Sequence, residues 1–239
     1  MLMQSRSRQE VPKMVPSEDE NEDDDWQLAD TSQSAERVKK VAAAAILASL
    51  SIAVSPIASF VPRIPMFGIA VFDPISLFWV IAFLVGGIWV GSVSMVAGVI
   101  MLNFFDPYPI IGPLLKFLAT APMILLPWLT VRGASRAGKD GILSRIPLLG
   151  NGIEEGAEGG IMLSGRYLYG ALMFLAYLVR LAVMIPVNLT VVPILWGIGD
   201  FAFIVGYTLV LNTVQSLWDA FLPFIVIHRT PVFKNYGMW

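Results

Sequence analysis

The stretch PISLFWVIAFLVGGIWVGSVSMVAGVIMLNFF, residues 74–105, decides the fold of this chain, because it runs for 32 residues without a charged side chain. The hydrocarbon core of a bilayer takes about 20 apolar residues per helical crossing, so the stretch is too long for one transmembrane helix. The pair Gly86-Gly87 interrupts its middle. We therefore predict two spans here, at about 74–86 and 88–104, joined by a tight turn.

Charged residues are equally rare on both sides of this stretch. From Val41 to Val131 the only charged side chains are those of Arg63, Asp73, Asp106 and Lys116. In the whole chain 56% of the residues are hydrophobic and 14% are charged, and the mean hydropathy is +0.70. A soluble domain carries about 25% charged residues. The composition therefore predicts an all-α, polytopic membrane protein.

Motifs for catalysis or metal binding are missing from the sequence. The chain has no cysteine and a single histidine, His228, and so offers no thiolate nucleophile and no histidine cluster. No serine nucleophile elbow, HExxH motif or pair of catalytic aspartates occurs. We expect no enzyme activity, no catalytic residue, no metal, no cofactor and no nucleic-acid partner.

The N-terminal segment has a different composition from the rest of the chain. Residues 1–36 hold ten of the eighteen acidic residues. A segment with so many charges and so few apolar side chains does not fold alone, so we predict a disordered acidic tail. The alternative is a docking arm for a basic partner. From Arg37 onward, thirteen Lys and Arg stand against eight Asp and Glu, which gives that part a net charge of +5.

Four further apolar segments complete the expected six-helix bundle, at about 41–60, 113–131, 166–187 and 201–227. Lys and Arg gather at 37–40, in the polar loop 132–165 and in the tail 229–239. Six spans place all three groups on one side, which the positive-inside rule makes cytoplasmic, together with both termini. The transmembrane domain is thus predicted at 37–228. A single helix over 74–104 would put the loop outside, against that rule.

Polar and aromatic side chains lie toward the external face on this topology: Asp73, Trp79, Tyr108, Lys116 and Asn188. Asp73 is also expected to cap the helix that begins at Pro74.

Further polar side chains are expected inside the spans. Arg180 lies well within the fifth span, and Asn212, Gln215 and Asp219 share one face of the sixth, at spacings of three and four residues. Polar groups at membrane depth are costly and face a cavity or a partner. We predict a substrate-binding pocket beneath the loops 58–72 and 188–200. The alternative is interhelical hydrogen bonding that only holds the bundle together.

A stripe of small residues marks the first span. Ala44, Ala48, Ser51 and Ser55 follow one another at helical spacing along one face. Small side chains let a second helix approach closely in a membrane. The stripe therefore predicts either packing within this chain or a docking surface for another subunit.

The order of features along residues 38–228 resembles a known family. The features are a small-residue first helix, a Pro-rich outer loop, a short second helix and a Gly-marked turn, with the segments FDPI at 72–75 and LVGGIWVG at 84–91. In this order they resemble the substrate-binding (S) components of energy-coupling factor (ECF) transporters, which import vitamins and trace nutrients.

The resemblance implies a six-helix subunit in the plasma membrane of a prokaryote, surrounded by lipid and with both termini cytoplasmic. It implies a small-molecule vitamin bound near the outer face, a transmembrane coupling subunit and two cytoplasmic ATPase subunits as partners. The family's Ala-x-x-x-Ala motif, which contacts the coupling subunit, is matched by Ala44 and Ala48.

Riboflavin-binding members of the family are the most similar. Their last helix carries a Phe-Asn-x-x-Lys pattern, and residues 211–215 read LNTVQ, so Asn212 matches and Gln215 replaces the lysine. Hydrogen bonds to the ligand are expected from Arg180, Asn188, Asn212 and Gln215. Two other functions stay open: a structural or assembly subunit of a larger membrane complex, and a stand-alone transporter, which would usually show inverted repeats.

Overall fold

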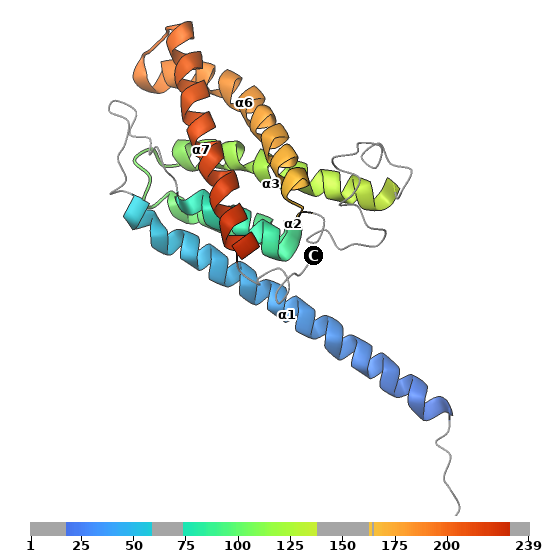
Figure 1. Cartoon of the computed structure of the whole chain (residues 1–239). Coiled ribbons are helices and arrows are strands. Elements are labelled where there is room, and N and C mark those ends of the chain that lie inside the picture. Colours follow the sequence, from blue (N-terminus) through green and yellow to red (C-terminus); the bar gives the residue numbers. More distant parts are fainter. Residues whose placement is uncertain (1–17, 59–73, 138–162, 164, 230–239) are drawn as a thin grey trace, which may run out of the picture. The chain divides into compact units, whose positions relative to one another are not determined.

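The computed structural model describes residues 18–58, 74–137, 163 and 165–229 (Figure 1). Five helices account for nearly all of them: α1 Glu18–Ala58, α2 Pro74–Leu102, α3 Ile111–Ala137, α6 Arg166–Trp196 and α7 Phe201–Arg229. Each contains a segment long and apolar enough to cross a membrane, and the described residues contain no strand. The prediction of an all-α, multi-pass membrane protein is confirmed.

The chain divides into two compact units, Met1–Lys39 and Lys40–Trp239. The division lies close to the predicted boundary of the acidic tail at residue 36. Residues 18–36 are helical in the structure, as the first part of α1. Most of the stability of a helix comes from packing an apolar face, and this acidic segment offers little apolar surface. That the tail is disordered stays a prediction.

The helix α2 reverses its direction at Gly87, where the backbone adopts φ 71° and ψ −169°. A Cβ atom added to Gly91 would lie 2.8 Å from the Cα atom of Phe83, so the residues before and after the reversal are in direct contact. Ile75 and Leu102 line the same cavity. In a straight helix they would lie about 40 Å apart, at 1.5 Å per residue. The two limbs therefore form the antiparallel hairpin that the glycine pair predicts.

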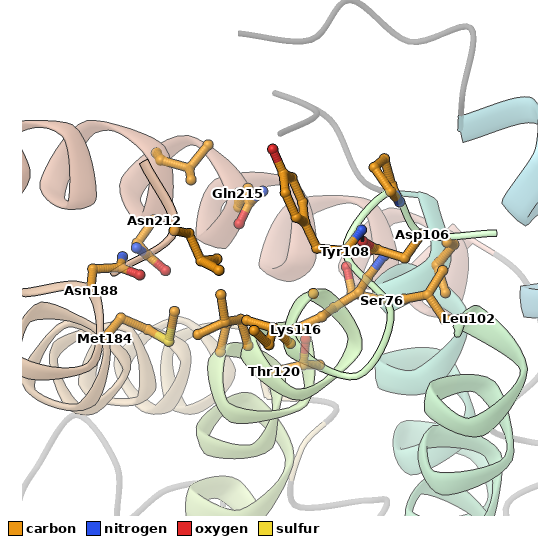
Figure 2. Close-up of a pocket in the computed structure, with 18 of the residues that line it drawn as sticks. Ser76, Leu102, Asp106, Tyr108, Lys116, Thr120, Met184, Asn188, Asn212 and Gln215 are labelled. Carbon is orange, nitrogen blue, oxygen red and sulfur yellow. Dashed lines mark hydrogen bonds between the residues drawn. The ribbon is translucent and has the colours of Figure 1, made fainter. Parts of the chain in front are cut away.

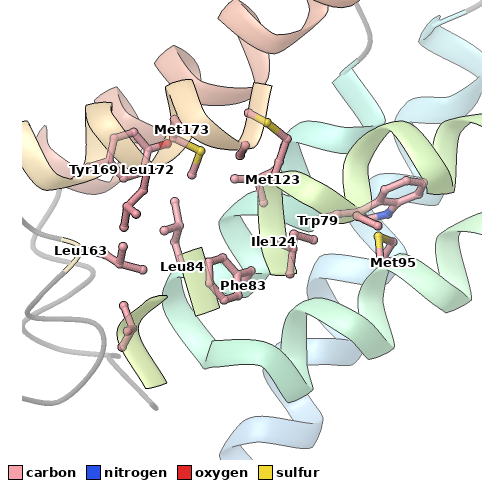
Figure 3. Close-up of a cluster of buried hydrophobic side chains, with 14 of the residues drawn as sticks. Trp79, Phe83, Leu84, Met95, Met123, Ile124, Leu163, Tyr169, Leu172 and Met173 are labelled. Carbon is pink, nitrogen blue, oxygen red and sulfur yellow. The ribbon is translucent and has the colours of Figure 1, made fainter. Parts of the chain in front are cut away.

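The hairpin packs into a bundle with the later helices. The helix α3 contacts α2 and α6, and α7 contacts α6 and α2. The main apolar core lies where they meet and contains the fully buried side chains of Trp79, Phe83, Met123 and Ile124 (Figure 3). Large apolar side chains also cover the outside of the bundle, as at Ile194, which is 76% exposed. An apolar exterior is what a surrounding bilayer requires.

The helix α6 is longer than the sequence predicted. It continues through Pro186 and Pro193 to Trp196, so the predicted loop 188–200 is wrong except for its last four residues. Proline is tolerated within membrane helices, because neighbouring groups satisfy the backbone carbonyls that it leaves without a partner. Gly197, with φ 68°, then ends the helix.

The small-residue stripe of α1 packs within its own chain. Ala44 is 2% and Ala48 7% exposed, and Ala44 lies against Ala82 and Val90 of α2. The Ser94 hydroxyl donates a hydrogen bond to the Ala44 carbonyl oxygen, with an O–O distance of 3.1 Å. The structure thus favours intramolecular packing for this stripe. A different row of small residues on α1 is exposed: Ala42, Ala45, Ser49 and Ala53.

We predict that Gly87→Ala destabilises the folded protein by about 1–3 kcal/mol, because the conformation at this position is one that essentially only glycine adopts. Thermal unfolding in detergent would measure the change. Gly170→Ala in α6 is the matched control, since an added Cβ there meets nothing within 4 Å and alanine favours a helix interior. Equal melting temperatures for the two variants would contradict the hairpin.

Candidate functional site

A cavity of about 170 Å³ lies between the five described helices (Figure 2). Its walls come from the last turn of α1, both ends of the α2 hairpin, the first half of α3, the second half of α6 and the middle of α7. The polar and aromatic residues among them are Ser55, Ser76, Phe105, Asp106, Tyr108, Lys116, Thr120, Arg180, Asn188, Trp196, Asn212 and Gln215.

The inner wall of this cavity is organised by the guanidinium group of Arg180, which is 2% exposed. Its Nε atom donates to Oδ1 of Asn212 at 2.9 Å, and its Nη2 atom donates to Oε1 of Gln215 at 2.8 Å. Its Nη1 atom donates to Oδ2 of Asp219 at 2.8 Å, which forms a buried ion pair. The face of α7 that the sequence predicted to be polar is therefore the partner surface for Arg180.

The ion pair also ties the hairpin to the rest of the bundle. The Ser76 hydroxyl donates to Oδ1 of Asp219 at 2.6 Å, so both carboxylate oxygens of Asp219 accept a hydrogen bond from a buried side chain. Ser76 lies in the first turn of α2, Arg180 in α6 and Asp219 in α7. One network thus fixes three helices relative to one another.

A second polar contact joins α6 and α7 about two turns nearer the end of α6. The Asn188 side-chain amide donates to the Thr208 hydroxyl at 3.0 Å, and the Asn212 amide donates to the Thr208 carbonyl oxygen at 2.8 Å. Thr208 is fully buried. Ser76 and Thr208 were missed by the sequence analysis, because single hydroxyl residues in apolar helices give no signal of which of them has a distant partner.

Two aromatic residues lie in contact at the exposed end of the cavity. The indole Nε1 of Trp196 donates to the hydroxyl of Tyr108 at 3.1 Å, and the two rings meet edge to face with a centroid distance of 5.4 Å. A neutral hydrogen bond contributes about 0.5–1.5 kcal/mol and an aromatic pair about the same. Both side chains are half-buried, whereas Arg180 and Asn212 in the cavity wall are fully buried.

The connection that carries Tyr108 is held in shape by two side chains. Oδ1 of Asp106 accepts the backbone N–H of Tyr108 at 2.8 Å, and Oδ1 of Asn103 accepts that of Ile110 at 2.6 Å. Ile110 has φ 70°, which is a strained conformation for a β-branched residue. Such a left-handed conformation costs about 1–2 kcal/mol. The strain is therefore similar in size to the contact between Tyr108 and Trp196.

The charges that line the cavity are balanced. Asp106 and Lys116 carry opposite charges, and Arg180 is neutralised by Asp219. Counted together with Asp219, the lining therefore combines balanced charges with several hydrogen-bonding groups and three aromatic rings. This arrangement suits a neutral solute that has polar groups and an apolar, flat part.

The structure brings together most of the predicted site residues: Tyr108, Lys116, Arg180, Asn188, Asn212 and Gln215 all line the cavity. Trp79 is fully buried in the apolar core and does not line it, although the Lys116 Nζ atom lies 5.8 Å from its ring centroid. Asp73 lies outside the described residues. Ala44 and Ala48 are buried elsewhere, between α1 and α2.

Comparisons of the chain with protein-family models, with curated proteins and with solved structures find no match.

We predict that Asp219→Asn lowers the stability of the protein by about 3–5 kcal/mol, because it leaves the charge of Arg180 buried without its counter-ion. The melting temperature of the detergent-solubilised variant measures the effect. Asp200→Asn makes the same chemical change at an exposed position, where Oδ1 of Asp200 caps the first turn of α7. Asparagine caps a helix as well as aspartate does, so this control should unfold as the parent protein does.

Proposed function

We propose that this chain is the solute-binding subunit of an importer of the energy-coupling factor type, which captures a vitamin at the outer face of the membrane. The observation that carries the proposal is a cavity at one end of an otherwise apolar bundle, lined by apolar side chains together with a charge-balanced set of polar groups. Polar and ionisable groups at membrane depth are expensive and mark substrate pathways. The network of Arg180, Asn212, Gln215 and Asp219 then serves to fix the shape of the binding site before the solute arrives.

The distribution of basic residues supports an outward-facing cavity. Lys40 lies near the start of the membrane-spanning part of α1, Arg132 near the end of α3, Arg166 at the start of α6 and Arg229 at the end of α7. These are the helix ends opposite to the cavity. By the positive-inside rule they are cytoplasmic, and so are both termini.

The α2 hairpin completes a six-span topology in this proposal. Each limb is about 20 Å long, shorter than the hydrocarbon core of about 30 Å. Both ends of the hairpin lie at the cavity, because Ile75 and Leu102 line it. The orientation of the later helices is therefore the same whether the hairpin crosses the membrane completely or in part.

The size of the cavity sets a condition on the ligand. Sites for drug-sized ligands measure about 300–1,000 Å³, whereas this cavity measures about 170 Å³. Riboflavin is the first vitamin to test, because Asn212 stands where the flavin-binding members have theirs. Its three-ring system requires the cavity to widen on binding. A smaller neutral vitamin fits with less change.

The proposal is tested by purifying the protein in mild detergent from its host membrane. We expect a vitamin in the extract, and a bound flavin would be seen directly from its absorbance and fluorescence. The purified protein should also be thermally stabilised by one member of a panel of vitamins, and Asn188→Leu should weaken that stabilisation at least tenfold in ligand concentration. A protein that yields no small molecule and responds to no vitamin would not be a solute-binding subunit.

A coupling subunit and two cytoplasmic ATPase subunits would supply the energy in this scheme. The contact with the coupling subunit would use the exposed face of α1, where Ala45 and Ser49 lie four residues apart. Small residues at this spacing allow close helix packing in a membrane. Ala44 and Ala48, which match the family's motif in sequence, are occupied by α2.

We predict that Ala45→Leu abolishes co-purification with a coupling subunit and leaves the melting temperature unchanged, because the new side chain points away from the bundle. Ala44→Leu is the matched variant, and it should lower the melting temperature, since Ala44 is packed against Ala82 and Val90. Affinity pull-down and thermal unfolding give the two readouts. Loss of association in the second variant alone would place the coupling contact on the other face.

A structural or assembly role is the second candidate. It is favoured by the hydrogen bonds of Arg180, which join α6 to Asn212, Gln215 and Asp219 of α7. In that role the polar groups would only join helices. The ligand experiment separates the two functions, because an assembly subunit would carry no solute.

A further inference from the structure

We infer that the contact between Tyr108 and Trp196 is a gate, which opens and closes the cavity by releasing and remaking one hydrogen bond. The inference concerns access to the cavity and does not depend on which solute the cavity takes. It rests on the position of the two residues, on the chain segments that carry them, and on the backbone strain at Ile110, which is close to Tyr108.

Tyr108 and Trp196 lie at the mouth of the cavity. Phe105 and Pro107 beside Tyr108 are exposed, and Tyr108 and Trp196 are half-buried. Elsewhere in the cavity wall, Thr120 is 1% exposed and Arg180 is 2% exposed. Figure 2 shows Tyr108 and Thr120 at opposite edges of the cavity. Among the described residues, the aromatic pair therefore lies at the end of the cavity from which a solute would reach the inner polar groups.

The two residues belong to segments that can separate. Tyr108 lies in the short connection between α2 and α3, and Trp196 is the last residue of α6. Their contact consists of the hydrogen bond from the indole Nε1 and the edge-to-face ring packing. Trp196 is followed by Gly197 at φ 68° and by Gly199, where an added Cβ would meet nothing within 4 Å. The space around these glycines leaves room for the end of α6 to move.

The strain at Ile110 opposes the closed state. Ile110 lies two residues after Tyr108 and has a φ of 70°. Its backbone N–H donates a hydrogen bond to Oδ1 of Asn103. Rotation of this connection to an ordinary backbone conformation would relieve the strain and withdraw Tyr108 from Trp196. Since the strain and the aromatic contact are similar in size, neither state dominates strongly. A nearly balanced pair of states is what a gate requires.

The absence of cysteine from the sequence makes the gate directly measurable. Thr120→Cys places one thiol on the buried wall of the cavity. The purified protein is treated in detergent with hydroxyethyl methanethiosulfonate, a small, polar and uncharged reagent, and mass spectrometry follows the modification with time. We expect the thiol at position 120 to react about tenfold faster when Tyr108→Ala removes the contact, and about threefold faster with Tyr108→Phe, which removes only the hydroxyl.

A change at Ile110 should act in the opposite direction. Asparagine tolerates a left-handed backbone better than isoleucine does, so Ile110→Asn stabilises the closed connection. We expect it to slow modification at position 120 by about threefold to tenfold. A mutation that only loosened the protein would speed the reaction instead.

Two further single-cysteine variants complete the design. Gly199→Cys reports the reactivity of an exposed thiol, and Ser94→Cys reports a buried thiol between α1 and α2, away from the cavity. Their rates should be the same with and without Tyr108→Ala. Equal rates at position 120 in the Tyr108→Ala and parent backgrounds would overturn the gate. Faster reaction at position 94 would also overturn it, because the fold as a whole would have loosened.

Discussion

The buried guanidinium of Arg180 is the constraint on which the rest of this structure depends. A positive charge within an apolar bundle needs a counter-charge and acceptors for its N–H groups. The helix α7 supplies them from three residues on one face, Asn212, Gln215 and Asp219. This requirement fixes how far α7 is rotated and shifted against α6. It extends to α2 through the bond from Ser76 to Asp219.

The cavity is a consequence of the same network. Below it, the bundle is filled with apolar side chains such as those of Phe83, Met123 and Ile124. At the level of Arg180, polar side chains and the paired charges lie among the apolar ones, and a space between the helices is left unfilled. The reversal at Gly87 contributes to this arrangement, because it returns α2 to the cavity and lets both of its ends form part of the wall.

Several features were predictable from local sequence. The length of the uncharged stretch and its glycine pair predicted the α2 hairpin, and helical spacing predicted the polar face of α7. Other features depended on distant residues. Trp79 is apolar enough for a core and polar enough for a membrane interface, so its type did not decide between them. Pro193 indicated a loop, yet α6 continues through it to Trp196. The gate was not predictable, since it joins residues 88 positions apart.

The sequence by itself determined that the chain is a helical membrane protein, because so few charges over so great a length leave no other way to solvate it. It also determined which face of each helix is small or polar, because helical periodicity is a local property. Only the tertiary structure decided what each face meets: α2 against the alanine stripe of α1, Arg180 against α7, and Trp196 against Tyr108. The reason is physical, since an alanine stripe or a polar face is compatible with several partners, and the packing of the whole bundle selects one.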